Sequence, residues 1–92
     1  MNKSVLIKAL SEDIGMKFAK AEKVLNTIFN EMANALVKAD RIEIRGFGIF
    51  KIKRYEGYQG RSPKTGHIIN VRPKKLPFFK CGKDLKDRVD SW

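Results

Sequence analysis

The spacing of the apolar residues changes near Asp40, and this change constrains the fold more than any other feature of the chain. Before Asp40, apolar residues recur three and four positions apart, which is the period of an amphipathic helix. After Asp40 they alternate with polar residues, which is the period of a strand with one apolar face. The sequence therefore predicts an α+β fold in which helices precede an antiparallel sheet.

Two helices are predicted before the change of period. The first covers about residues 4–14, with Asn2 or Ser4 as its N-cap and Gly15 as its stop. The second covers about residues 17–39, which is roughly six turns. Core packing is the ordinary role of its broad apolar face, formed by Phe18, Ala21, Leu25, Ile28, Phe29, Met32, Ala35, Leu36 and Ala39.

The alternating part predicts two hairpins and a returning strand. Residues 41–53 alternate around Gly46-Phe47-Gly48 and form the first hairpin. Its second strand continues past Tyr55, makes a type I turn with Pro63 in second place, and returns through residues 68–71. Few apolar residues of this second hairpin face one way, so we expect a flexible, protruding arm.

A last strand over about residues 75–80 completes a three-stranded sheet, and a short helix over residues 82–90 ends the chain with Leu85 and Val89 inward. Ninety-two residues suffice for one domain. We divide it into a helical dimerisation region (1–40), a sheet region (41–80, with the arm at about 55–73) and a C-terminal helix (81–92). Hydrophobic residues make up 42% of the chain, more than a small monomer with a polar arm can cover, so we expect oligomerisation.

Positive charge is concentrated in one third of the chain. Residues 51–80 contain nine Lys or Arg against one anion, Glu56, which leaves +8 of the total net charge of +10. Nucleic acid is the common extended anion for such a segment, because Lys and Arg neutralise phosphates and release counterions. An acidic protein surface or an anionic membrane is the alternative partner.

The residues that other classes of protein require are absent from this sequence. One His, one Cys and ten scattered carboxylates give no convergent catalytic group, so we expect no enzyme and no small-molecule substrate. Cys81 cannot form an internal disulfide and has no metal-ligand spacing with His67, so we expect no metal and no cofactor. No apolar run approaches a membrane span or a signal core, so we expect no membrane partner and a cytoplasmic location.

The predicted arm combines cations with Tyr55, Tyr58 and an apolar ring, Pro63, at the point of greatest reach. An apolar wedge at the tip of a basic ribbon can enter a groove of DNA, unstack one base step and kink the duplex. An ordinary turn proline is the alternative, which the local sequence slightly favours. Tyr55 and Tyr58 would equally suit stacking on single-stranded or structured RNA.

Three segments, residues 41–50, 60–66 and 79–86, closely resemble the bacterial HU and integration host factor family of DNA-bending proteins. The resemblance covers the whole chain without insertions. It implies an intertwined dimer in which two β-arms embrace DNA over a helical base. It also implies an architectural, histone-like function in the bacterial nucleoid: binding duplex DNA through the minor groove with low sequence specificity, bending it by proline intercalation, and compacting the chromosome.

The resemblance also implies the residues that do this. Pro63 would intercalate, with Arg61 and Lys64 beside it in the minor groove. The implied DNA-binding set is Lys3, Arg45, Lys53, Tyr55, Tyr58, Arg61, Ser62, Pro63, Lys64, Thr65, Arg72, Lys75, Lys80, Lys83 and Lys86. The implied dimer core is Leu25, Phe29, Met32, Leu36, Ile44, Phe47, Phe50 and Phe79.

The chain departs from the family pattern at three places. Ser62 stands where the family usually has Asn, Tyr55 and Tyr58 stand where many members have Arg, and Cys81 replaces a Pro or small residue. The tyrosines imply more stacking against sugars and less charge in the arm. A homodimer is the expected partner arrangement. A heterodimer with a related subunit and some site preference stays open, because residues 41–48 resemble a subunit of integration host factor.

Overall fold

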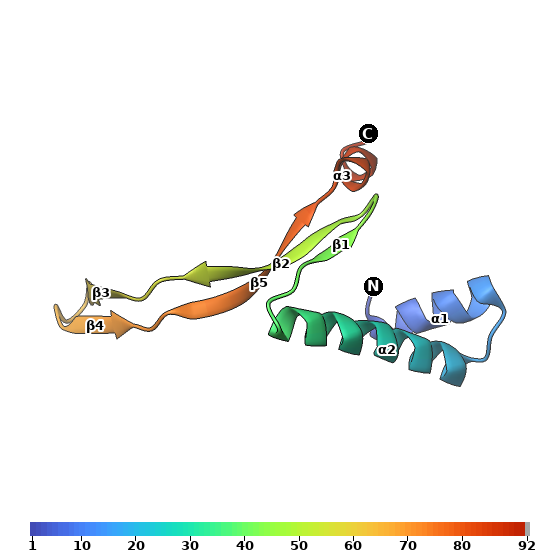
Figure 1. Cartoon of the computed structure of the whole chain (residues 1–92), viewed down its shortest axis with the longest axis horizontal. Helices are drawn as coiled ribbons and strands as arrows, with labels where there is room; N and C mark the ends of the chain where they lie inside the picture. Colours follow the sequence, from blue (N-terminus) through green and yellow to red (C-terminus); the bar gives the residue numbers. More distant parts are fainter. Residues whose placement is uncertain (92) are drawn as a thin grey trace. The chain divides into compact units, whose positions relative to one another are not determined.

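The computed structural model describes residues 1–91, which form three helices and five strands (Figure 1). Their order is α1 (Lys3–Ile14), α2 (Phe18–Val37), β1 (Ile42–Ile44), β2 (Gly48–Tyr55), β3 (Tyr58–Arg61), β4 (Ile68–Val71), β5 (Lys74–Cys81) and α3 (Lys83–Val89). The predicted α+β class is confirmed. The chain divides into two compact units, a helical unit of Met1–Ala35 and a sheet unit that begins at Leu36.

The caps of α1 lie where the sequence places them. The Asn2 side chain accepts a hydrogen bond from the Val5 N–H at 3.0 Å, which satisfies one of the free amides of the first turn. Gly15 ends the helix in the left-handed conformation, with φ of 71°, and its N–H donates to the Ser11 carbonyl. A glycine tolerates this backbone without the strain of a side chain.

The buried core of the helical unit is small. Ile7 of α1 packs on Ala21 and Leu25 of α2, and these three are the buried hydrophobic side chains of residues 1–91. Figure 1 shows the two helices side by side. Farther along α2, the apolar face continues but stays uncovered, since Phe29 is 41% exposed. The chain by itself therefore buries only part of the face that the sequence marks as core.

The three-stranded sheet has the order β1-β2-β5 and is antiparallel throughout. Phe50 of β2 lies opposite both Ile42 and Phe79. Because alternate residues point to opposite faces, this register places apolar side chains on one face of the sheet. We call it the apolar face; it consists of Ile42, Ile44, Phe50, Ile52, Pro77 and Phe79.

Three phenyl rings cluster on the apolar face. The Phe79 ring centroid lies 4.6 Å from that of Phe50 and 5.5 Å from that of Phe47. Gly48 leaves the space for this contact, since a Cβ there would lie 2.6 Å from both the Phe79 ring and the Lys80 carbonyl oxygen. Phe79 nevertheless remains 38% exposed, so the cluster is only half covered.

We predict that Gly48→Ala destabilises the protein by about 1–3 kcal/mol, the usual penalty for forcing atoms into a packed site. Chemical denaturation followed by circular dichroism measures the change. Gly60→Ala is the matched control, because a Cβ at Gly60 meets only the Tyr58 ring at an ordinary 3.5 Å. Equal stability of the Gly48 variant and the wild type would contradict the close packing described above.

The arm is not a continuation of the sheet, and the expected unbroken strand past Tyr55 was wrong. The β2–β5 ladder ends at the pair Tyr55–Lys74, and pairing resumes at Tyr58–Val71 as a separate two-stranded ribbon, β3–β4. Pro73 lies in the break and has no N–H for a ladder. At Gly57 the two segments of the arm approach so closely that a Cβ would lie 2.6 Å from the Val71 carbonyl oxygen.

The turn at the tip of the ribbon also differs from the expected type I turn. The Gly66 N–H donates to the Ser62 carbonyl at 2.8 Å, so the closing hydrogen bond spans five residues instead of four. Gly66 adopts a φ of 70°, which favours glycine. The Ser62 N–H donates to the His67 carbonyl and joins the turn to the ribbon, leaving Pro63 exposed at the end.

The terminal helix α3 follows directly on β5. The Gly82 N–H donates to the Phe47 carbonyl at 2.8 Å, which ties the start of α3 to the turn between β1 and β2. Leu85 is half-buried as expected, but the expectation that Val89 points inward was wrong, because Val89 is 76% exposed. Too little of this chain reaches α3 to cover both side chains.

Candidate nucleic-acid interface

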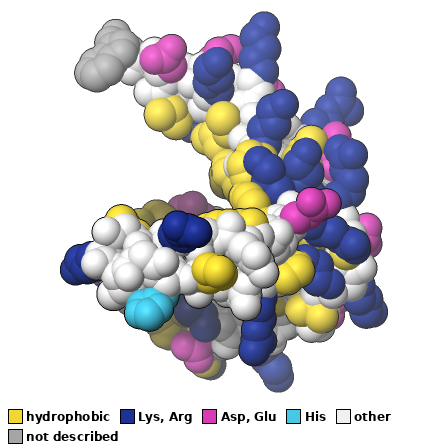
Figure 2. Space-filling model, turned by 90° about the vertical axis from the view of Figure 1, so that its left-hand side faces the viewer, with side chains coloured by type: hydrophobic (Ala, Val, Ile, Leu, Met, Phe, Trp, Pro, Cys, Tyr) yellow, Lys and Arg dark blue, Asp and Glu magenta, His cyan; other side chains and the backbone are white. Residues whose placement is uncertain are grey.

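The cations of the sheet unit have almost no anionic partners. Among residues 1–91 the one ion pair joins Arg41 to Glu43 at 3.4 Å, and both side chains are largely exposed. Residues 51–80 contain nine cations and the single carboxylate of Glu56. Figure 2 shows Lys and Arg side chains standing out from the surface beside exposed hydrophobic groups. The segment therefore has a strong uncompensated positive field.

Four lysines share the face of the sheet opposite the apolar face. Lys53 and Lys80, both predicted, are joined there by Lys51 and Lys74, which the sequence analysis missed. We call this the basic face, defined by Lys51, Lys53, Lys74 and Lys80. The alternation of β2 could have found Lys51, two residues before Lys53. Finding Lys74 also requires its pairing with Tyr55, which sequence alone does not give.

Aromatic rings lie among these lysines. The Lys53 ammonium is 4.6 Å from the centroid of Phe78, and the Lys74 ammonium is 5.8 Å from that of Tyr55. Such cation–π contacts contribute about 0.5–1 kcal/mol at exposed sites. They position the ammonium groups over the sheet without neutralising them, so the basic face can still attract anions.

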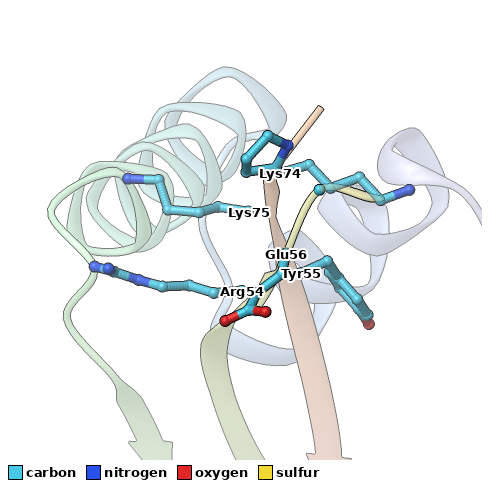
Figure 3. Close-up of a pocket in the computed structure, with 7 residues that line it drawn as sticks. Arg54, Tyr55, Glu56, Lys74 and Lys75 are labelled. Atoms are coloured by element: carbon cyan, nitrogen blue, oxygen red, sulfur yellow. The ribbon is translucent and has the colours of Figure 1, made fainter. Parts of the chain in front are cut away.

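Lys75 lies apart from the basic face. It pairs with Arg54, and both belong to the side of the strands that bears the apolar face. Figure 3 shows Arg54 and Lys75 extending to one side of the strands, and Tyr55 and Lys74 to the other. Near this end of the ladder, the strands therefore present cations on both faces. A ligand that lies along the arm could contact the cations of either face.

The predicted residues of the ribbon and its tip are accessible. Arg61, Pro63, Lys64, Thr65 and Arg72 are exposed, and Ser62 is half-buried with its backbone engaged in the turn. Tyr58 is 65% exposed on the opposite side of β3 from Arg61. The structure thus brings the tip residues together around Pro63.

The other predicted cations lie outside the ribbon. Arg45 is exposed in the turn between β1 and β2, and the hydrogen bond from Gly82 to Phe47 sets this turn beside the start of α3 with Lys83. Lys86 lies one turn further along α3, and Lys3 belongs to the first turn of α1 in the helical unit. All four are exposed and available to a large anionic surface.

A family of proteins described as bacterial DNA-binding protein matches residues 1–90 of this chain. The chain belongs to the HU family of bacterial DNA-binding proteins. The predicted family is therefore confirmed. Membership of a DNA-binding family accords with the expectation of a binding protein in place of an enzyme.

Solved structures of similar chains agree with this fold. Anabaena HU, seen in a cocrystal with DNA, has a TM-score of 0.87 and 28% identity, over 97% of each chain. A mutant HU from Thermotoga maritima has a TM-score of 0.72 and 31% identity, over 97% of this chain and 99% of that one. A mutant of transcription factor 1 has a TM-score of 0.66 and 27% identity, over 98% and 91% of the chains.

Other kinds of site are not found in the part of the chain that the structure describes. No group of three or more His, Cys, Asp or Glu side chains there could hold a metal ion. No helix there has both the length and the apolar character to cross a membrane. Cys81 has a free, exposed thiol, and its backbone lies opposite Gly48 in the ladder.

Proposed function

We propose that this HU-family chain is an architectural protein that binds duplex DNA as a dimer, through the minor groove and with little base readout. Pro63 of each subunit intercalates and bends the DNA, and many such bends organise and compact the nucleoid in the cytoplasm. One observation carries this proposal above all: a two-stranded ribbon, separate from the sheet, presents an exposed proline between Arg61 and Lys64.

Dimer formation is supported by what the chain fails to bury. Three buried hydrophobic side chains in residues 1–91 are far fewer than a stable domain of this size needs. Meanwhile Phe29, Ile44, Phe47 and Phe79 of the implied dimer core are each at least 38% exposed. Met32, Leu36 and Phe50 are half-buried, and only Leu25 is buried. A second subunit on these surfaces would supply the missing core.

Bending follows from the shape and chemistry of the tip. The pyrrolidine ring of Pro63 is apolar and rigid, so it can enter a base step, at a cost of a few kcal/mol for unstacking. Smooth bending of a site of about 20–30 base pairs costs a further 1–6 kcal/mol or so. Phosphate contacts from the basic face and the flanking lysines offset the costs of unstacking and bending. Because these costs are lower for nicked or pre-bent DNA, such DNA should bind more tightly.

The contribution of α3 can be measured by salt dependence. We expect Lys83→Ala with Lys86→Ala to lower the slope of log affinity against log salt by about 0.9 for each phosphate that the variant no longer neutralises. Lys20→Ala with Lys23→Ala is the matched control, because it removes the same charge from exposed positions on α2. If both double variants change the slope equally, net charge and not a DNA path over α3 controls affinity.

The proposal as a whole is tested on the purified chain. We expect a dimer in sedimentation equilibrium, and a rise in energy transfer between the labelled ends of a random-sequence duplex of about 35 base pairs as protein is added. Bending confined to particular sites, or a chain that folds only with a related subunit, would indicate a heterodimer. Preference for single strands over the duplex would overturn the proposal in favour of an RNA or single-strand binder.

A further inference from the structure

The tip of the ribbon has one titratable side chain that the proposed DNA contacts do not use. His67, the single histidine of the chain, follows the turn that presents Pro63. Its carbonyl accepts a hydrogen bond from the Ser62 N–H at 2.9 Å, and its N–H donates to the Thr65 hydroxyl oxygen at 3.4 Å. The backbone of His67 is therefore part of the turn, which holds the imidazole ring at the tip.

The imidazole ring of His67 has no partner in the described part of the chain. It is exposed, and within residues 1–91 it makes no hydrogen bond or ion pair. Figure 2 shows the single histidine, in cyan, standing out from the surface. Both ring nitrogens are therefore accessible to a ligand.

His67 and Arg61 lie on opposite faces of the ribbon. Arg61 pairs with Ile68, so these two side chains share a face. Because successive residues of a strand alternate, His67 belongs to the other face, with Ile69 and Tyr58. One face of the tip therefore has the permanent charge of Arg61, and the other has a ring whose charge depends on pH.

The charged side chains near His67 are all cationic. In residues 58–71 they are Arg61 and Lys64, and the other titratable group is the Tyr58 phenol. This segment contains no Asp or Glu, and β3 and β4 pair only with each other, so no carboxylate lies beside the ring in the ladder. An imidazolium here lacks a counterion within residues 1–91 and would gain one from a phosphate.

We propose that His67 is a further DNA contact of the tip: its imidazolium binds a backbone phosphate, so each tip takes up a proton when it enters the groove. The inference rests on the proposed function, because it adds a phosphate contact to the same ribbon. A ribbon inside a groove has a sugar–phosphate strand on either side, so both of its faces meet phosphates. Arg61 would contact one strand and His67 the other.

The direction of the pH dependence follows from the charge of the ligand. A phosphate stabilises the imidazolium and not the neutral ring, so the protonated form of His67 binds DNA more tightly. Histidine changes its charge between about pH 5 and 8. Affinity for DNA should therefore rise as the pH falls through this range, and acidification of the surroundings would strengthen binding.

The test measures the affinity of the purified protein for a fully paired duplex of about 35 base pairs at about pH 5.5 and about pH 8.5, on either side of the titration of histidine. An exposed ion pair contributes a factor of about 1.5–5, and the proposed dimer has two tips, so we expect binding about 2–25-fold tighter at the lower pH. The slope of log affinity against log salt should also be steeper there, by up to about 1.8, because each phosphate contact contributes about 0.9. Equal affinities and equal slopes at the two pH values would overturn the inference.

Two substitutions assign the effect to the ring. His67→Asn should have, at both pH values, the weaker affinity that the wild type has at the higher pH. His67→Lys should have the tighter affinity at both, because its charge is permanent in this range. The Met1 amino group and the Cys81 thiol are common to all three proteins, so their protonation cancels in the comparison. A pH dependence in either variant as large as that of the wild type would overturn the assignment.

A third variant separates a contact at the tip from an effect of net charge. Lys20→His with His67→Asn places the one histidine at an exposed position of α2, in the helical unit. We expect this double variant to bind DNA with little dependence on pH. A pH dependence as large as that of the wild type would show that net charge controls the effect, and would overturn the inference. Failure of the proposed function would be seen separately, as the absence of binding to the duplex at either pH.

Discussion

Replacing Phe79 with alanine will both dissociate and unfold the protein. Its ring contacts Phe47 and Phe50 and covers Gly48, and the proposed second subunit would bury the rest of it. Removing a large buried ring costs about 3–5 kcal/mol, a large part of a total stability of about 5–15 kcal/mol. Sedimentation equilibrium and urea denaturation at several protein concentrations measure both effects.

Phe78→Ala is the matched control for this experiment. Phe78 is the neighbour of Phe79 on β5 and is almost equally exposed, at 36% against 38%, but it lies on the basic face under Lys51 and Lys53. Its loss should leave the dimer intact and lower stability far less. Equal effects of the two substitutions, or a denaturation midpoint independent of protein concentration, would contradict association through the apolar face.

Pro63→Ala will leave much of the affinity but strongly reduce the bend. In the proposed complex, most contacts to phosphate come from lysines and arginines that this change does not touch, whereas the wedge proposed to unstack a base step is removed. Energy transfer between the labelled ends of the duplex should fall toward that of free DNA. Pro73→Ala, which changes a proline of the same arm at the broken ladder, should retain the bend.

A second substrate separates intercalation from other roles of the tip. On a duplex nicked at the kink site, unstacking costs little, so wild type and the Pro63 variant should bend the DNA to similar extents. Unchanged bending of the intact duplex by the Pro63 variant would remove this residue from the mechanism. Equal loss of bending on both duplexes would show that the substitution disturbs the turn closed by Ser62 and Gly66.

The elements of this fold are local enough to predict. The periods of the apolar residues and the caps Asn2 and Gly15 give α1 and α2, and the alternation around Gly46-Phe47-Gly48 gives β1 and β2. The broken ladder was missed although Pro73 indicates it, since proline disfavours strand pairing. The exposure of Val89 could not be predicted, because it depends on which other surfaces are present.

The site was predictable in composition but not in arrangement. Charge counting identifies the basic third of the chain, and the family motif points to Pro63 as the residue that we propose to intercalate. The separation of Lys53 and Lys80 from Lys75 depends on the register between β2 and β5, which joins residues far apart in sequence.

Because the ladder is interrupted, the end of the arm is structurally independent of the sheet. Residues 58–71 pair only with each other and contribute none of the three buried side chains, so their sequence can vary without a penalty to the body of the protein. Substitutions in these residues can therefore alter the proposed contact with DNA separately from the stability of the rest of the fold.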